Sequence, residues 1–415
     1  MNKLQSLTAT LLLFSLAAIA PATASDWPQW RGPHRDGVSS ETGLLKDWPA
    51  GGPPLVWEAT GLGSGFATVS VVDERIYTAG EKEASSFVFA LNVADGKQVW
   101  SAKLGKPAAP AGVVGPRAAP TVDGNLLFVV EQTGELLCLE TGSGTEKWRK
   151  SFTKDFGGGQ PNWGFTESPL VDGDQVAVTP GGAKGAVVAL NKQTGALLWQ
   201  STGFTDPAHY SSLILAEIGG VKQYVVLTPS SVAGIAAADG KLLWRAPRRG
   251  QTAVIPTPIW TGDFVYVTSG YGAGCNLFKL SANSGSFTAQ EVYANKVIVN
   301  HHGGAIKVGD YVYGYSDGKG WTCQTFLTGE AKWQNKEKLG KGGLVYADGH
   351  FYLRQEDGPG TVALIEATPD GYKEHGRFNQ PHRSKEHSWP HPVIANGKLY
   401  LRDQDVLLCY DVKAR

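Results

Sequence analysis

The sequence has no excess of charge of either sign, because its 415 residues include 38 Lys and Arg against 38 Asp and Glu. Such a chain lacks the overall positive field that supports non-specific nucleic-acid binding. It also lacks a Gly-x-Ser-x-Gly nucleophile elbow and a His-Glu-x-x-His zinc motif. We therefore expect no nucleic-acid partner, and no motif selects a particular hydrolase.

Cysteine is scarce, with four residues and no Cys-Cys or Cys-x-x-Cys pair. The usual zinc-ribbon and covalent-haem spacings are therefore excluded. Long membrane-spanning runs are missing as well, since the apolar stretch Leu11–Ala20 is too short to cross a bilayer stably.

That stretch instead has the features of a secretory signal peptide. It follows Lys3 and precedes an Ala-x-Ala cleavage site at Ala22–Ala24. We predict a signal peptide over residues 1–24 and one mature domain over residues 25–415, located in the periplasm or secreted. The alternative is an uncleaved anchor. No Cys directly follows the apolar stretch, so we expect no lipid attachment site there. We also expect no stable membrane anchor.

Glycine and tryptophan are abundant, with 53 and 13 residues, and they recur at regular intervals. One phrase begins with a small residue, passes through Thr-Gly or Asp-Gly and ends in Trp. Its copies are Ala90–Trp100, Cys138–Trp148, Ala189–Trp199, Gly234–Trp244 and Cys323–Trp333. The distance along the sequence from Trp244 to Trp333 is about twice that between the other successive Trp residues. Leu280–Gly285 lies in this interval and is a degenerate copy of the phrase without the Trp.

A second phrase, two apolar runs around a polar turn that contains Gly in all copies but one, precedes each copy. It occurs eight times, over residues 72–77, 122–128, 171–176, 218–224, 261–266, 308–313, 347–352 and 395–400. Such turns favour hairpins, because Gly reaches positive φ without strain. Four strands repeated about every 46 residues predict an all-β, eight-bladed β-propeller of four-stranded antiparallel blades.

The two ends of the chain complement each other. The last repeat, Val393–Val412, has three strands and ends without a Trp, whereas Leu55–Glu58 near the N-terminus resembles a fourth strand. We therefore expect the N-terminal strand to complete the eighth blade and close the ring.

The same alignment gives three cysteines a structural role. Cys138, Cys323 and Cys409 occupy a position that takes Ala or Gly in other copies. We expect them to be buried free thiols that act as small apolar groups. Cys275 lies outside this position.

The repeat resembles the tryptophan-docking motif of quinoprotein alcohol dehydrogenases, members of the PQQ-like propeller family. It is also similar to the BamB-type propeller of the outer-membrane assembly machinery. The short secreted PQQ-repeat proteins are the most similar group, and their opening is like Trp27–Pro33 of this chain. The resemblance covers roughly residues 26–415. It implies the fold, whereas function depends on the site that each member carries.

The propeller predicts a polar ligand funnel on its axis. It is formed by the loops that join the fourth strand of one blade to the first strand of the next, and by those that join the second strand of a blade to its third. Polar and aromatic residues in these loops are our site candidates. For catalysis they are Glu167, His302 and Asp317, and for binding a cofactor or ligand they are Arg117, Trp163, Asn300, Lys319, Trp321, Trp389 and His391.

Each candidate has a chemical reason and a structural alternative. Glu167 suits a general base, or a carboxylate that accepts from loop amides. Lys319 and Trp321 suit a planar anion, or a solvated Lys and a Trp packed between blades. We predict no metal site, since His301 and His302 would point to opposite faces of a strand.

Three functions are compatible with these residues. The first is a periplasmic binding or scaffold protein for a small ligand or an envelope protein, expected to be a monomer. The second is a quinoprotein alcohol or sugar dehydrogenase, for which the resemblance implies PQQ with Ca²⁺. The third is another enzyme of the funnel, such as a hydrolase or lyase. Whether the chain is an enzyme stays open.

Three departures weigh against the quinoprotein function. The Gly-Ala-Glu loop that supplies a calcium ligand in that family is matched in this chain by Pro180–Gly185, which has no carboxylate. The vicinal Cys pair that stacks on PQQ is absent, and the chain lacks the usual insertions around the substrate. Glu167 with Asn300 would have to replace the calcium ligands.

Overall fold

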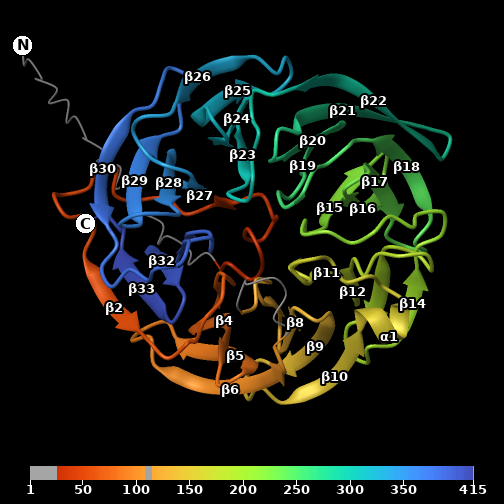
Figure 1. Ribbon diagram of the computed structural model, residues 1–415, viewed down its shortest axis with the longest axis horizontal. Coiled ribbons are helices and arrows are strands. Elements are labelled where there is room, and N and C mark those ends of the chain that lie inside the picture. The colour runs from red at the N-terminus through yellow and green to blue at the C-terminus, as the bar shows by residue number, and fades with distance from the viewer. Residues whose placement is uncertain (1–25, 108–114, 415) are drawn as a thin grey trace, which may run out of the picture.

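Eight antiparallel sheets surround a central axis in the computed structural model, which describes residues 26–107 and 115–414 (Figure 1). Each sheet forms one blade, with a short inner strand at the axis and a more exposed outer strand at the rim. The predicted all-β, eight-bladed propeller is confirmed. One short helix, α1 (Phe152–Phe156), follows the outer strand of the second blade.

We number the blades in chain order. Within each blade, the four strands are given in order from the inner edge to the outer edge. Blade 1 contains β3 (Ser70–Val72), β4 (Arg75–Lys82), β5 (Ser85–Asn92) and β6 (Gln98–Gly105), and blade 2 contains β7 (Thr121–Asp123), β8 (Leu126–Val130), β9 (Glu135–Glu140) and β10 (Glu146–Ser151). Blade 3 contains β11 (Leu170–Asp172), β12 (Gln175–Val178), β13 (Val188–Asn191) and β14 (Leu197–Gln200), and blade 4 contains β15 (Ile214–Ile218), β16 (Val221–Leu227), β17 (Ser231–Ala236) and β18 (Leu242–Pro247).

The second half of the ring continues the pattern. Blade 5 contains β19 (Ile259–Thr261), β20 (Phe264–Ser269), β21 (Gly274–Asn283) and β22 (Ser286–Asn295), and blade 6 contains β23 (Ala305–Val308), β24 (Tyr311–Ser316), β25 (Gly320–Thr325) and β26 (Ala331–Asn335). Blade 7 contains β27 (Gly342–Ala347), β28 (His350–Gln355), β29 (Thr361–Glu366) and β30 (Glu374–Asn379), and blade 8 contains β31 (Val393–Ala395), β32 (Lys398–Asp403), β33 (Val406–Asp411) and β2 (Leu55–Ala59).

At four junctions between neighbouring blades, a tryptophan of one blade packs on a glycine of the next. Trp100 of blade 1 donates its indole N–H to the carbonyl of Thr141 in blade 2 at 2.9 Å. Its ring lies over Gly144, where an added Cβ would be 2.6 Å from a ring carbon. The same pairs recur as Trp57 with Gly96, Trp148 with Gly195 and Trp199 with Gly240. The repeated Gly-to-Trp spacing of the sequence therefore encodes the contact between blades.

The degenerate copy in blade 5 has a physical substitute for its missing tryptophan. Tyr293 pairs with Leu277, as the tryptophans pair with their small partners, and its hydroxyl donates to the carbonyl of Phe326 at 2.8 Å. A Cβ on Gly329 of the next blade would lie 2.9 Å from the ring of Tyr293. A phenol thus makes the contact that an indole makes elsewhere.

The cysteines occupy the predicted positions. Cys138, Cys323 and Cys409 are buried free thiols, each paired across the sheet with the tryptophan of its blade. Cys275 is also buried, in β21, and its thiol donates to Asn295 Oδ1 at 3.1 Å. The expected role as small apolar groups is confirmed for the first three.

The N-terminal part of the chain closes the ring in two places. Strand β2 pairs antiparallel with β33, and Trp57 lies opposite Cys409, so the predicted closure is confirmed. In addition, β1 (Val38–Ser39) pairs parallel with β27 as a fifth strand of blade 7. The sequence did not predict that pairing.

The segment before β1, Trp27–Gly37, runs through the centre of the ring, and we refer to it as the axial segment (Figure 1). Its contacts reach most blades: Trp27 with Val71, Pro28 with Val122, Arg35 with Ser168, Trp30 with Thr257 and Arg31 with Ala305. Because Trp27–Pro33 is the characteristic opening of the sequence, this position explains why the opening is rich in aromatic and cationic residues.

None of the helices among the described residues is long and apolar enough to cross a membrane. The predicted signal peptide lies outside the described residues and stays a prediction.

The packing of indole on glycine can be tested with two alanine substitutions. Gly240 and Gly173 both have positive φ, but only Gly240 lies under a ring, whereas a Cβ on Gly173 would meet nothing within 4 Å. We expect Gly173→Ala to lower the free energy of unfolding by about 1 kcal/mol through backbone strain. Gly240→Ala should lower it by about 1–3 kcal/mol more, because the methyl group displaces Trp199. Equal losses in denaturant unfolding would contradict the docking.

Candidate functional site

A cavity of about 270 Å³ lies at the axis, bounded by the loops that precede the inner strands. These loops come from blades 1 to 6 and blade 8, and the turn between β20 and β21 adds one more wall. The aromatic lining residues are Trp30, Phe66, Trp163, Tyr210, Tyr271 and Trp389, and the polar ones are Arg117, Thr166, Ser212, His301, His302 and His391. The cavity is where we predicted a funnel, and aromatic and polar side chains contribute equally to its walls.

The axial segment contributes Trp30 to the lining of this cavity. The indole N–H of Trp30 donates to Thr257 Oγ1 at 2.8 Å, and its ring centroid lies 4.6 Å from that of His391. His391 in turn bonds through Nε2 to the carbonyl of His302 at 3.0 Å. Burial lowers the pKa of His391 to about 3, and the charge of Arg31 adds to this, so the ring is neutral.

One wall contains a histidine held by a buried carboxylate. His302 Nε2 bonds to Oε2 of Glu356, and the same oxygen accepts the indole N–H of Trp389 at 3.0 Å. Lys341 lies 3.6 Å from the other oxygen. Burial alone would raise the pKa of Glu356, but the hydrogen bond and charge of His302, together with Lys341, outweigh it and lower the pKa to about 2. Glu356 is therefore ionised and oriented.

The adjacent histidine belongs to a second chain of contacts. Lys341 Nζ lies 2.5 Å from Nδ1 of His301, and Nε2 of His301 lies 2.9 Å from the hydroxyl of Tyr271. Burial lowers the pKa of His301 to about 3, with the charges of His302 and Lys341 adding to the effect, so His301 is neutral. Since an ammonium only donates, His301 Nδ1 accepts and Nε2–H donates to Tyr271.

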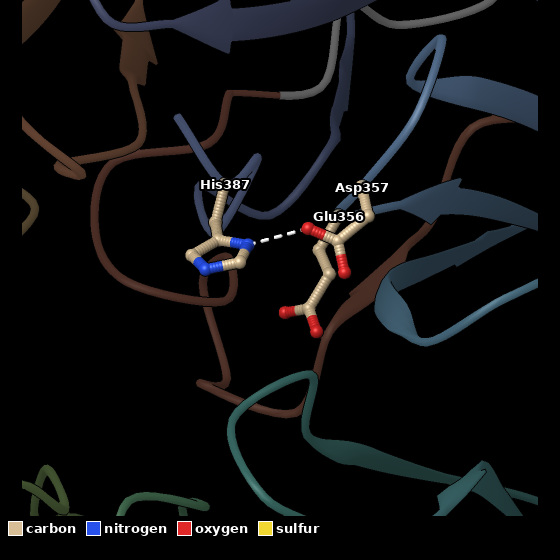
Figure 2. Close-up of side chains that lie close together, drawn as sticks. All are labelled: Glu356, Asp357 and His387. Carbon is tan, nitrogen blue, oxygen red and sulfur yellow. Dashed lines mark hydrogen bonds and ion pairs between the residues drawn. The ribbon is translucent and has the colours of Figure 1, made fainter. Parts of the chain in front are cut away.

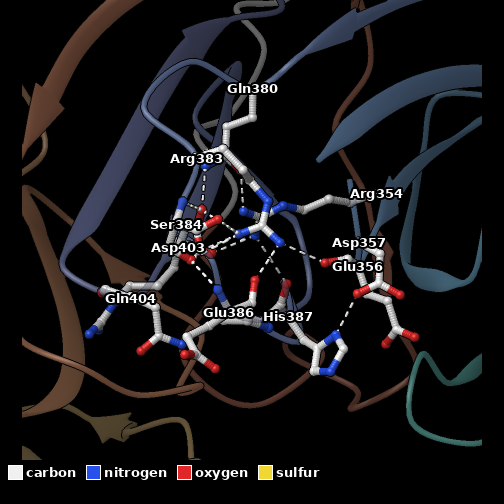
Figure 3. A network of polar contacts seen from close by, with 12 residues as sticks. Arg354, Glu356, Asp357, Gln380, Arg383, Ser384, Glu386, His387, Asp403 and Gln404 are labelled. Atoms are coloured by element: carbon white, nitrogen blue, oxygen red, sulfur yellow. Dashed lines mark hydrogen bonds and ion pairs between the residues drawn. The ribbon is translucent and has the colours of Figure 1, made fainter. Parts of the chain in front are cut away.

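Glu356 is held from behind by a network between blades 7 and 8 (Figure 3). The guanidinium of Arg383 donates to the carbonyl of Glu356 at 2.7 Å and to both carboxylate oxygens of Asp403. Arg354 is fully buried and bonds to the side chain of Gln380, which donates to Asp403 at 2.9 Å. This network fixes the loop that carries Trp389 against the loop that carries Glu356.

Figure 2 shows that Glu356 and Asp357 also lie close to His387, with ligand atoms within 4.8 Å of one another. His387 Nδ1 is already bonded to Asp357 at 2.5 Å, and Glu356 Oε2 is taken by two donors. These contacts already occupy the ligand atoms of His387 Nδ1 and Glu356 Oε2, and we assign no metal to the group.

Half of the sequence-predicted site residues meet in the cavity. They are Arg117, Trp163, His302, Trp389 and His391. Asp317 lies just outside, 3.9 Å from Lys341, and burial raises its pKa. The expectation that His301 and His302 point apart is wrong, because both lie in a loop and their ring centroids are 5.0 Å apart.

Three other candidates have structural contacts and do not line the cavity. Asn300 braces its own loop by donating to the carbonyl of Tyr315 and accepting from the amide of Gly304. Lys319 donates to the carbonyl of Lys296 at 2.7 Å. Trp321 is buried among residues of blades 6 and 7, as in the alternative that we considered.

Glu167 is buried outside the cavity, where it accepts from the amide of Thr179. Its other carboxylate oxygen has no partner among the described residues. Burial raises its pKa to about 7, although the Thr179 bonds and the nearby Arg35 act in the opposite direction. This position matches the structural alternative, a carboxylate bonded to a loop amide.

Sequence reasoning missed Glu356, Lys341, Tyr271 and Trp30. One signal was available: Glu356 follows β28 directly, just as Asp317 follows β24, so the two occupy equivalent positions of the repeat. Aligning that position across all blades would have selected Glu356 together with Asp317.

The raised pKa of Glu167 makes a pH-dependent prediction. Below pH 4.5 both folded and unfolded states are protonated, whereas between about 4.5 and 7 only the unfolded state ionises. Folding stability therefore falls as the pH rises through this window, by on the order of 3 kcal/mol at about 1.4 kcal/mol per pH unit. Glu167→Gln should remove most of this loss, so its melting temperature relative to the parent should increase from pH 4.5 to 8. A constant difference would contradict the raised pKa.

Comparisons with known proteins agree with this architecture. The sequence profile of the family described as outer membrane protein assembly factor BamB matches residues 84–335. No curated protein matches the chain.

Solved structures share the fold at low identity. BamB from Moraxella catarrhalis has a TM-score of 0.63 at 16% identity, covering 87% of this chain and 98% of that chain. The quinohemoprotein alcohol dehydrogenase of Comamonas testosteroni has a TM-score of 0.62 at 12% identity, covering 96% and 82%. The computationally designed Ika8 protein has a TM-score of 0.59 at 10% identity, covering 86% and 99%. With the family profile matched over most of its blades, this chain belongs to the PQQ-like propeller family described as outer membrane protein assembly factor BamB.

Proposed function

We propose that this protein is a binding protein of the cell envelope whose axial cavity takes a small, planar organic anion. The observation that supports it is the cavity itself, in which six aromatic side chains surround a space that also contains Arg117. Its volume of about 270 Å³ is near the lower end for ligand sites, which suits a molecule of one or two rings.

Arg117 gives the preference for an anion. Burial lowers its pKa to about 10, which still leaves the guanidinium charged at neutral pH. It is the only Lys or Arg side chain among the described residues that line the cavity, and it also donates to the carbonyl of Trp163. A guanidinium binds carboxylates through paired hydrogen bonds, and the aromatic walls provide faces on which a ring stacks.

The described surface favours ligand binding over a scaffold function. Large exposed apolar side chains on outer strands are divided among blades: Leu55 and Val56 in blade 8, Val99 in blade 1, Leu197 and Leu198 in blade 3 and Val292 in blade 5. A protein-docking surface is expected to gather such residues in one patch. Location in the envelope rests on the predicted signal peptide and on the family.

The quinoprotein function fits these residues poorly. A calcium ion beside PQQ needs carboxylate or amide oxygens, but the described lining has no Asp, Glu, Asn or Gln side chain. The nearest carboxylate, Glu356, is occupied by His302 and Trp389, and all four cysteines are buried within sheets. We therefore derive no redox step for this site.

Binding can be measured by tryptophan fluorescence with naphthalene-2-carboxylate as the probe and 2-naphthalenemethanol as its neutral counterpart. We expect the carboxylate to quench the cavity tryptophans and to bind more tightly than the alcohol. Arg117→Gln should weaken carboxylate binding by about 10- to 100-fold, as for a charge-assisted hydrogen bond, and leave the alcohol nearly unaffected.

Arg75→Gln is the matched control, since Arg75 lies at the start of β4 in blade 1, away from the lining, and bonds to Asn92. Equal binding of both probes, or an unchanged affinity in Arg117→Gln, would overturn the proposal. A thermal shift that requires PQQ and Ca²⁺ together would instead favour the quinoprotein.

A further inference from the structure

We propose that the protein has a second site farther along the axis, which binds an extended peptide as an added strand on the inner edge of β15. The peptide that fits this site has a basic side chain opposite Glu217. The inference does not depend on the proposed function, because the two cavities share no lining residue.

A second cavity, of about 490 Å³, lies between the axial segment and the inner strands β11, β15 and β19, which face the axis in neighbouring blades (Figure 1). Residues 33–36 of the axial segment form one wall. The first cavity is bounded by the loops that precede the inner strands, whereas this one is lined by the strands themselves. Its volume is within the range typical of ligand sites.

The second cavity runs along the edge of β15. Four consecutive residues of this strand, Ile214–Glu217, line it, although successive side chains of a strand point to opposite faces. Both faces can meet one cavity only where the cavity lies at the edge of the strand. β15 is the first strand of its sheet, so this edge pairs with no other strand. An unpaired edge presents main-chain donors and acceptors to a binding partner.

The main-chain groups of Leu215 and Glu217 point to this edge. Ile218 and Val221 flank a two-residue turn, and such a pair is hydrogen-bonded within its hairpin. Bonded and non-bonded pairs alternate, so Leu215 and Glu217 direct their N–H and C=O groups away from β16. In the described part of the chain, no residue outside blade 4 makes a hydrogen bond to either of them.

The chain itself adds main chain to the same edge in other blades. Val71 precedes the last residue of β3, as Glu217 does in β15, and it exchanges two main-chain hydrogen bonds with Trp27, at 2.7 and 2.9 Å. Tyr346 has this position in β27, and its amide donates to the carbonyl of Gly37 at 3.0 Å, where β1 is added as a parallel strand. Inner edges of this propeller are therefore able to bind an extended segment.

Among the strands that line the second cavity, β15 offers the longest edge. It has five residues and presents two of them, Leu215 and Glu217, whereas β11 and β19 have three residues each. Leu215 and Glu217 are two positions apart, so their side chains share a face of the sheet. Residues opposite them in an added strand lie about 4.5–5.5 Å away between Cβ atoms, which is close enough for direct contact. This recognition through main chain needs no large apolar patch.

The charges around the second cavity favour a basic side chain opposite Glu217. Two carboxylates, Asp36 and Glu217, line the cavity, and Glu217 is exposed and accepts no hydrogen bond from the described residues. The two cations of the lining already have partners. Arg35 is buried and donates to two backbone carbonyls just before β11, and Lys222 forms an ion pair with Asp172 at 2.9 Å. Opposite charges directly across a strand pair attract, so the peptide residue there is Lys or Arg.

The test uses acetyl-Lys-Thr-Val-Thr-Lys-amide, whose sequence reads the same in both directions and so places Val opposite Leu215 and Lys opposite Glu217 in either orientation. We expect titration calorimetry of the full chain to show saturable binding with a Kd below about 1 mM. Two isomers with two N-methyl groups each test the main-chain bonds, one methylated at Val and the last Lys and the other at both Thr. A strand bonds to its neighbour through alternate residues, so their affinities should differ by at least about 10-fold. Absence of saturable binding, or equal affinities of the isomers, would overturn the inference.

Variants locate the site. Glu217→Gln should weaken binding of the peptide by about two- to fivefold, as for a cross-strand ion pair, and leave an analogue with norleucine in place of Lys unaffected. Glu74→Gln is the matched control, since Glu74 is exposed in the turn between β3 and β4, outside the lining, and its affinity should equal that of the parent. Leu215→Pro removes an N–H that points away from β16, so it should abolish binding and keep the hydrogen bonds of the ladder.

The outcomes are distinct from those of the first proposal. If Leu215→Pro, shown to be folded by its cooperative thermal unfolding, binds the peptide as the parent does, the placement on β15 is wrong. Should Leu215→Pro not fold, an unchanged affinity in Glu217→Gln contradicts the inference instead. Naphthalene-2-carboxylate should bind the parent and Glu217→Gln equally, so a failure of that probe counts against the proposed function alone.

Discussion

The contact on which the rest of the structure depends is an outer-strand aromatic ring packed on a glycine of the following blade. A four-stranded sheet cannot bury both of its faces alone, so each blade is stable only against its neighbours. Because the ring and the glycine recur at one position of the repeat, they also fix the rotation from blade to blade. This contact is present at five of the eight junctions, and closure of the ring brings the loops before the inner strands to one axis, where they surround the cavity.

The N-terminal part of the chain contributes both to the closure of the ring and to the lining of the cavity. Strand β2 completes blade 8 with Trp57, while the axial segment places Trp30 in the cavity and bonds to loops around the ring. Arg31 and Arg35 are buried there, and burial lowers their pKa values to about 10 and about 9. They are tolerated because most of their partners are backbone carbonyls that the ring presents inward. The characteristic opening of the sequence is thus a part of the cavity as well as of the fold.

The fold could be predicted from the sequence because its determinants are periodic. The Trp-Gly pairs, the hairpin turns and the small residues opposite each Trp repeat with the blade, so even the closing strand at Trp57 was recognisable. The site has no such period, since it is assembled from loops of different length. His301 and His302 illustrate this: strand alternation predicted opposite faces, but a loop is free to turn both rings inward. Glu356 was missed because its function depends on His302, a residue 54 positions away that only the closed ring brings near.

The electrostatic field inside the cavity depends on which charged side chains line it directly and which are separated from it by aromatic rings. Glu356 is ionised, but the rings of His302 and Trp389, which donate to it, stand between the carboxylate and the cavity, and Lys341 lies on its other side. Arg117 lines the cavity directly, in surroundings dry enough to lower its pKa to about 10. Because charges interact more strongly where water is excluded, a ligand there experiences the guanidinium far more than the carboxylate. The same separation allows Glu356 to hold His302 without repelling an anion, so a buried carboxylate and an anion-binding guanidinium are compatible around one small space.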